Sequence, residues 1–171
     1  MNLRQQILKE HSKANSLLIA DWVGADQERF AQLLHLMLND EYRVVQRAAW
    51  SLSFIADRHP ELMAPHLEAL VRSIGQPGVA DAVKRNVLRM LQHVPLPEAL
   101  HGPLMNLAFR FLEDPAQPIA VRVFSMTVLG RLALVYPELK SELRAVIGEI
   151  LAREATPAFR ARSKAVLKQI A

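Results

Sequence analysis

Cysteine is absent from the 171-residue sequence, which excludes disulfide bonds and sites built on thiolate ligands. Aromatic residues make up only 6%, and the six glycines form neither a phosphate-binding loop nor a Gly-x-Ser-x-Gly turn. No stretch approaches 18 apolar residues without a charge, so no membrane-spanning helix is expected. The first ten residues lack the apolar core of a secretory signal. These absences together predict a soluble, cytoplasmic protein.

The sequence also lacks a large excess of either charge, since its 21 Lys and Arg residues are nearly balanced by 17 Asp and Glu residues, for a net charge of +4. Half the residues (51%) are hydrophobic and 22% are charged, which is typical of a folded globular chain. Such a balance permits an anionic partner but does not require one. The basic excess is concentrated near the C-terminus, where a single acid, Glu154, faces Arg153, Arg160, Arg162, Lys164 and Lys168.

What the sequence does contain is an internal repeat. The segment from Val44 to Leu52 recurs with the same apolar frame at residues 83–91, 121–129 and 159–167, at steps of 39, 38 and 38 residues. In each copy the first and ninth positions are large and apolar, and the residues between them fit one face of an α-helix. Four copies at a nearly constant period predict a chain of repeated helical units.

A second helix precedes each of these segments and carries its own apolar stripe with spacing i, i+3, i+4, i+7. The stripe of the first copy is Phe30, Leu33, Leu34 and Met37, and equivalent stripes begin at Leu67, Leu104 and Leu143. Pro-Glu pairs stand between repeats, where a helix start tolerates proline. Pro65 and Gly102-Pro103 predict a kink or restart within a first helix, and Thr156-Pro157 predicts a helix start.

These patterns predict an all-α fold of four helical hairpins in a single domain over residues 1–171. Residues 1–24 are off the period and are predicted to form an N-terminal capping segment. The four predicted repeats span residues 26–58, 60–94, 97–136 and 137–171.

The second helices resemble the HEAT repeat, in which an acidic turn is followed by Val-Arg, small residues and a Leu. The third copy is most similar, with Asp114-Pro115, Val121-Arg122 and Leu129-Gly130. The resemblance covers residues 26–171 and implies a right-handed α–α superhelix of the HEAT/ARM type. It also implies a structural role, pairing with turn carboxylates, for the basic residue after the first apolar position, which is Lys84, Arg122 and Arg160 in three of the four copies.

In such proteins the second helices line the concave surface, and this implies a candidate partner-binding groove. With the first, fifth and ninth positions in the core, the predicted solvent face holds Gln46, Asn86, Val123 and Thr127 beside the candidate groove residues. Those groove residues are Arg47, Trp50, Arg85, Arg89, Arg131 and Arg162. Tryptophan and arginine are common in interaction hot spots, and the arginine fork suits carboxylates and phosphates. The alternative interpretation is that these arginines only solvate the helices and that the N-terminal cap covers Trp50.

The function expected from this surface is a non-catalytic scaffold that holds a protein partner or an acidic peptide segment. Nucleic-acid binding by the same groove is the alternative, placed second because the net charge is modest and no aromatic stacking platform is evident. The six histidines show no metal-ligand spacing, so no metal or other cofactor is expected. DNA glycosylases built from HEAT-like repeats are similar in outline only, and no motif here supports carrying over their catalytic residues. An enzyme is therefore not expected.

Overall fold

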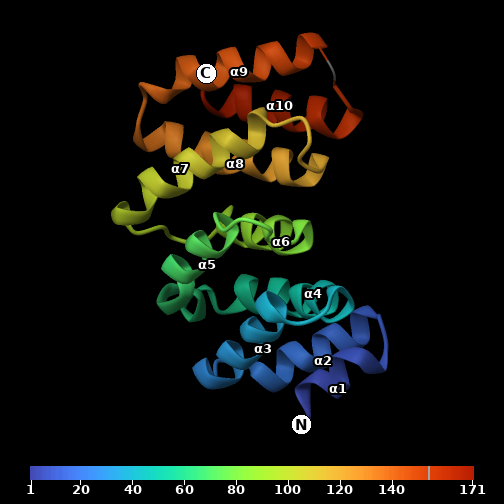
Figure 1. Cartoon of the computed structure of the whole chain (residues 1–171). Coiled ribbons are helices and arrows are strands. Elements are labelled where there is room, and N and C mark those ends of the chain that lie inside the picture. The colour runs from blue at the N-terminus through green and yellow to red at the C-terminus, as the bar shows by residue number, and fades with distance from the viewer. Residues whose placement is uncertain (154) are drawn as a thin grey trace. The chain divides into compact units, whose positions relative to one another are not determined.

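The computed structural model describes residues 1–153 and 155–171 (Figure 1), and every regular element in this described part is helical. The predicted all-α fold is confirmed. The chain divides into two compact units, Met1–Met90 and Leu91–Ala171, and each is considered by itself below. That all 171 residues act as one domain stays a prediction.

The first unit is built around one long helix, α4, which packs against helices from both its sides in the sequence. Its neighbours are α1, α2, α3 and the 3₁₀ helix η1. The elements of this unit are α1 (Leu3–Lys9), α2 (Lys13–Val23), α3 (Gln27–Asn39), α4 (Tyr42–Arg58), η1 (Pro60–His66), α5 (Leu67–Ile74) and α6 (Asp81–Leu91), whose last residue begins the second unit.

The helix boundaries of the first unit follow from the chemistry of single residues. Asn2, Ser12 and Asp26 are N-caps whose side-chain oxygens accept hydrogen bonds from backbone N–H groups of the first turn. Gly24 ends α2 with φ +53°, a left-handed conformation that side chains disfavour. Local sequence therefore fixes where α1, α2 and α3 begin.

The predicted apolar stripes form the core of the first unit. Phe30, Leu33 and Met37 of α3 are completely buried, as are Val44 and Leu52 of α4. An ion pair adds a link at the surface, where Arg4 of α1 lies 2.8 Å from the Asp40 carboxylate after α3. The Arg4 guanidinium holds the pKa of Asp40 below its ordinary value, chiefly through their hydrogen bond. Both groups are solvent-accessible, so this pair contributes little stability.

The two internal prolines have different effects. Pro65 lies in η1, and the α-helical geometry of α5 begins two residues later at Leu67, so the predicted restart is confirmed here. Pro103 instead lies inside the continuous helix α7, so of the predicted kink or restart only the restart is excluded there. Gly102 explains the difference, because a glycine before proline has no Cβ to clash with the proline ring in the helical conformation.

The second unit is built around α8, which packs against α7, α9 and α10. Its residues Val121, Met126, Leu129 and Ala133 are buried on several sides of the helix, and Phe159 of α10 joins them. Thr156 caps α10 by accepting from the N–H of Phe159, with Pro157 at the first position as predicted. The helices of this unit are α7 (Glu98–Glu113), α8 (Ile119–Val135), α9 (Leu139–Arg153) and α10 (Pro157–Gln169).

Two glycines of the second unit occupy opposite environments. A Cβ at Gly130 of α8 would lie 3.0 Å from a methyl carbon of Val166, so the missing side chain lets α8 and α10 approach closely. A Cβ at Gly148 of α9 would meet nothing within 4 Å. The glycine is therefore needed for packing at position 130, whereas at position 148 it only weakens the helix.

We predict that Leu129→Ala lowers the free energy of unfolding by about 2–5 kcal/mol, because the side chain is 1% exposed and its removal leaves a cavity. The measurement is the denaturant midpoint followed by far-ultraviolet circular dichroism. Leu134→Ala is the matched control, since Leu134 is 51% exposed on the same helix. Equal midpoints for the two variants would show that the core assignment is wrong.

Substitutions at Gly148 and Gly130 are predicted to change the free energy of unfolding in opposite directions. Gly148→Ala is expected to raise the free energy of unfolding by about 0.5–1 kcal/mol, the gain in helix propensity at an open site. Gly130→Leu is expected to lower it, because the new side chain would occupy the space of Val166. Thermal melts of both variants test this, and stabilisation by Gly130→Leu would contradict the close approach of α8 and α10.

Candidate partner-binding surface

Among the six predicted groove residues, Arg47, Arg131 and Arg162 have polar acceptors inside their own unit. Arg47 of α4 donates from Nη1 to the backbone oxygens of Ile7 and Leu8, at 3.2 and 3.0 Å. These carbonyls belong to the last turn of α1, where an α-helix leaves its C=O groups without intrahelical partners. The guanidinium therefore satisfies a helix end and carries the positive charge that this end favours.

Arg131 of α8 makes the same kind of contact in the second unit. Its two Nη atoms donate to the backbone oxygens of Leu91 and Val94, at 2.7 and 2.8 Å. Partial burial of the side chain lowers the pKa of the Arg131 guanidinium from its ordinary value. In both units, then, an arginine about 40 residues further along the chain donates to backbone oxygens at or just beyond a helix end.

Arg162 of α10 is also engaged. Its Nη1 donates to Oε1 of Gln92 at 3.0 Å and to the hydroxyl oxygen of Thr127, and its guanidinium lies 6.0 Å from the centroid of the Phe124 ring. A further arginine that the sequence did not single out, Arg144 of α9, donates to the backbone oxygen of Ile170 at 2.6 Å, beyond the end of α10. Its signal in the sequence is weak, because the acceptor is a backbone atom 26 residues away.

Trp50 of α4 is half-buried and lies in an aromatic group. Its ring is stacked with that of Phe54 at a centroid distance of 6.5 Å, and it forms a T-shaped pair with the ring of His11 at 5.3 Å. The N-terminal segment therefore covers part of Trp50 but leaves part exposed. Sequence reasoning missed Phe54, although its spacing of four residues from Trp50 places both side chains on one face of the helix.

The two candidate residues of α6 differ in exposure. Arg89 is exposed and Arg85 is half-buried. Arg85 makes no hydrogen bond or ion pair with any described residue. The prediction that Asn86 faces solvent is wrong, because its side chain is 8% exposed and donates to the Ala82 oxygen at 2.8 Å. Val123 of α8 is likewise buried rather than exposed, since α8 is covered on more than one side.

The three basic residues for which a structural role is predicted, Lys84, Arg122 and Arg160, differ in burial. Lys84 is buried and its Nζ lies 2.7 Å from the Asp81 carboxylate one turn earlier. Arg122 is buried, donates from Nε to the Leu112 oxygen at 3.0 Å, and lies over the Phe159 ring. Arg160 is exposed and donates to the Ala155 oxygen at 3.3 Å. The environments of Lys84 and Arg122 suit a structural role, whereas Arg160 is at the surface.

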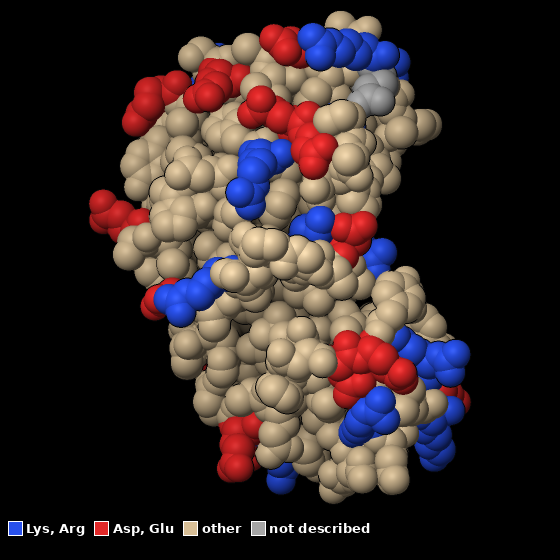
Figure 2. Space-filling view, in the orientation of Figure 1, with Lys and Arg blue, Asp and Glu red and all other residues tan. Residues whose placement is uncertain are grey.

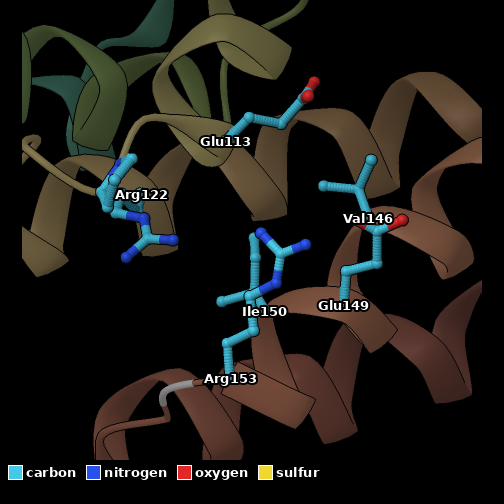
Figure 3. A pocket seen from close by; sticks show the side chains of 7 residues that line it. Glu113, Arg122, Val146, Glu149, Ile150 and Arg153 are labelled. Carbon is cyan, nitrogen blue, oxygen red and sulfur yellow. The ribbon is translucent and has the colours of Figure 1, made fainter.

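The second unit also has a pocket of about 330 Å³ between the end of α7, the start of α8 and the last turns of α9 (Figure 3). Arg122 and Arg153 extend toward the same space, from α8 and α9 respectively. Two acids also line it, so the pocket does not select a ligand of one charge. The lining residues are Glu113, Pro115, Arg122, Val146, Glu149, Ile150 and Arg153.

Neither metal ligands nor a membrane-spanning segment is found in the described part of the chain. Residues 1–153 and 155–171 contain no group of three His, Asp or Glu side chains placed to hold a metal ion. No helix among these same residues is long and apolar enough to cross a membrane.

Comparison with known proteins assigns this helical architecture to a family. A family model described as a HEAT repeat domain matches residues 3–170, almost the whole chain. The chain belongs to the HEAT repeat family. HEAT repeats generally act as protein-interaction scaffolds, and the family is typically non-catalytic. No curated protein and no solved structure gave a match to this chain.

The family match extends further toward the N-terminus than the resemblance found in the sequence, which began at residue 26. It includes α1 and α2, which the period alone assigned to a capping segment. The helix α4 packs against both. The first two helices are thus integral to the HEAT-repeat region of this chain.

The contacts of Arg131 predict a stability effect. Arg131→Gln is expected to lower the free energy of unfolding by about 1.5–3 kcal/mol, because it removes charge-assisted hydrogen bonds to two backbone oxygens. Arg72→Gln is the control, since Arg72 is an exposed residue paired only with Glu68 on its own helix, a pair that contributes about 0.3–0.5 kcal/mol. Urea titrations give both values. An Arg131 variant no less stable than the Arg72 variant would exclude a structural role for these bonds.

Proposed function

We propose that this HEAT-repeat protein is a non-catalytic scaffold that binds an acidic segment of a protein partner. Arg47, Arg131 and Arg162 have acceptors within their own units, and Arg85 has none among the described residues. The proposed contact therefore centres on Arg85 and Trp50, with Arg89 and Phe54 on the same two helices. We call these four residues the α4–α6 face. All of them lie on second helices of the first unit.

The observation that carries the proposal is the combination of a half-exposed aromatic pair with an arginine that has no internal acceptor. Trp50 and Phe54 offer apolar area at small entropic cost, because aromatic side chains have few rotatable bonds. The Arg85 guanidinium can form two parallel hydrogen bonds to a carboxylate, and no described residue competes for it. An acidic segment that also carries an apolar side chain suits both features.

The mixed charge on the one face that Figure 2 draws favours a protein partner over nucleic acid. Figure 2 shows one face of the molecule, on which Lys and Arg patches are interspersed with Asp and Glu patches and neither sign covers the surface. Nucleic-acid binding without sequence preference relies on a continuous positive surface along the phosphate backbone. A short segment with a few carboxylates needs only the local charge that Arg85 and Arg89 supply.

The test is selection of binders from a display library of acidic and neutral peptides, followed by affinity measurement for the selected sequences. We expect acidic peptides to be enriched and their affinity to fall at least about 10-fold, or 1.4 kcal/mol, with Trp50→Ala and with Arg85→Glu. Arg72→Glu is the control, because it makes the same charge change on an exposed residue of α5. Circular dichroism and melting temperature confirm that each variant is folded.

Two outcomes would contradict the proposal. Affinity that is unchanged in both α4–α6 face variants would place the binding surface elsewhere. Tight binding of single-stranded or duplex oligonucleotides that weakens steeply with salt and is lost in the Arg85→Glu variant would favour the nucleic-acid alternative instead.

A further inference from the structure

The last helix of the chain has a surface of one charge sign. Helix α10 contains four basic residues and no Asp or Glu. Arg162 points to Gln92 and Thr127, on the side that faces α8, and is half-buried. The other three, Arg160, Lys164 and Lys168, are exposed. They are spaced by four residues and so form one row along the helix, which we call the α10 row.

No carboxylate among the described residues pairs with this row. Lys164 and Lys168 make no hydrogen bond or ion pair within the described part of the chain, and Arg160 donates only to the Ala155 oxygen there. An exposed helix surface needs charge to stay solvated, but it does not need charge of a single sign. The neighbouring helix α9 mixes the two signs, with sequence LKSELRAVIGEILAR. Solvation alone therefore does not explain the composition of α10.

The position of Arg160 strengthens this argument. It lies in the first turn of α10, where the helix dipole favours negative charge and disfavours a cation. That first turn contains no acidic residue. An arginine placed there costs the isolated helix some stability, and a carboxylate supplied by a partner would offset that cost.

Small side chains lie beside the row. Ala158, Ala161 and Ala165 are exposed on the same side of α10, and their methyl groups leave room for a second helix to lie alongside. Neighbouring members of the row are about 6 Å apart along the helix axis, the rise of four residues. Carboxylates at every fourth position of a partner helix have the same spacing, and a preformed helix would hold three of them in place at once.

We propose that the α10 row is a second docking surface, which takes an acidic helix with Glu or Asp at positions i, i+4 and i+8. It is separate from the α4–α6 face, and it does not depend on that face binding a partner. The recognition is electrostatic, with three charge pairs beside the exposed alanine side chains of α10.

The experiment uses the full chain and a fluorescent, alanine-rich helical peptide with three Glu residues at i, i+4 and i+8, with fluorescence anisotropy as the readout. The test variant is Arg160→Glu/Lys164→Glu/Lys168→Glu. The matched control is Lys9→Glu/Lys13→Glu/Arg43→Glu, which changes three exposed basic residues of the first unit and alters the net charge equally. Arg160→Glu replaces a cation that the helix dipole disfavours, so α10 is expected to stay folded.

We expect the affinity for the peptide to fall at least 10-fold in the α10 row variant and to stay within about threefold in the control. A peptide with Lys in place of Glu should bind the α10 row variant and not the wild type. A peptide of the same composition with its Glu residues on different faces, and one interrupted by proline, should both bind weakly.

Several results would overturn the proposal. Equal losses in the two triple variants would show that net charge, not the row, controls binding. Equal affinity for the interrupted peptide would exclude recognition of a helix. Binding of single-stranded or duplex oligonucleotides tighter than the acidic helix, and lost in the same variant, would assign the row to nucleic acid. Loss of peptide selection at the α4–α6 face in the α10 row variant would show that the two surfaces are not independent.

Discussion

A helix with an apolar stripe on one side cannot bury that stripe alone, and the rest of this structure depends on that constraint. Each hairpin covers part of its own stripe, and neighbouring helices must cover the remainder. In the first unit α4 is covered by helices before and after it in the chain, and in the second unit α8 has the same place. These central helices contain Leu52 and Leu129, whose side chains are almost completely excluded from solvent.

Helix ends also have unsatisfied polar groups, because the last four carbonyls of each helix have no intrahelical donors. Arg47, Arg131 and Arg144 provide donors in this protein by reaching from another helix to backbone oxygens at or beyond helix ends. A guanidinium suits this purpose, because its donors spread in a plane and can reach two oxygens at once. The guanidinium groups of these residues consequently donate to the backbone of the protein itself.

This use of arginine changes how the basic character of the chain should be interpreted. Arginines that donate to backbone oxygens supply little to a partner, whereas Arg85 and the row on α10 have no carboxylate within the described residues. The surface available for binding is therefore smaller and more localised than the composition suggests. Membership of the HEAT repeat family agrees with a role in protein interaction.

The sequence by itself determined the helical repeats, because apolar periodicity and helix caps such as Asp26 and Thr156 are local properties of the chain. It also located the stripes of the core, including Phe30 and Leu129. It could not separate Arg47 and Arg131 from Arg85, since all three occupy similar positions on amphipathic helices. The acceptors of Arg47 and Arg131 are backbone oxygens about 40 residues away in the sequence. Every residue has such an oxygen, so the residue types do not indicate which one is the acceptor. Only the tertiary structure, by bringing those helix ends within hydrogen-bonding distance, decided which of these arginines donate to the backbone of the protein and which do not.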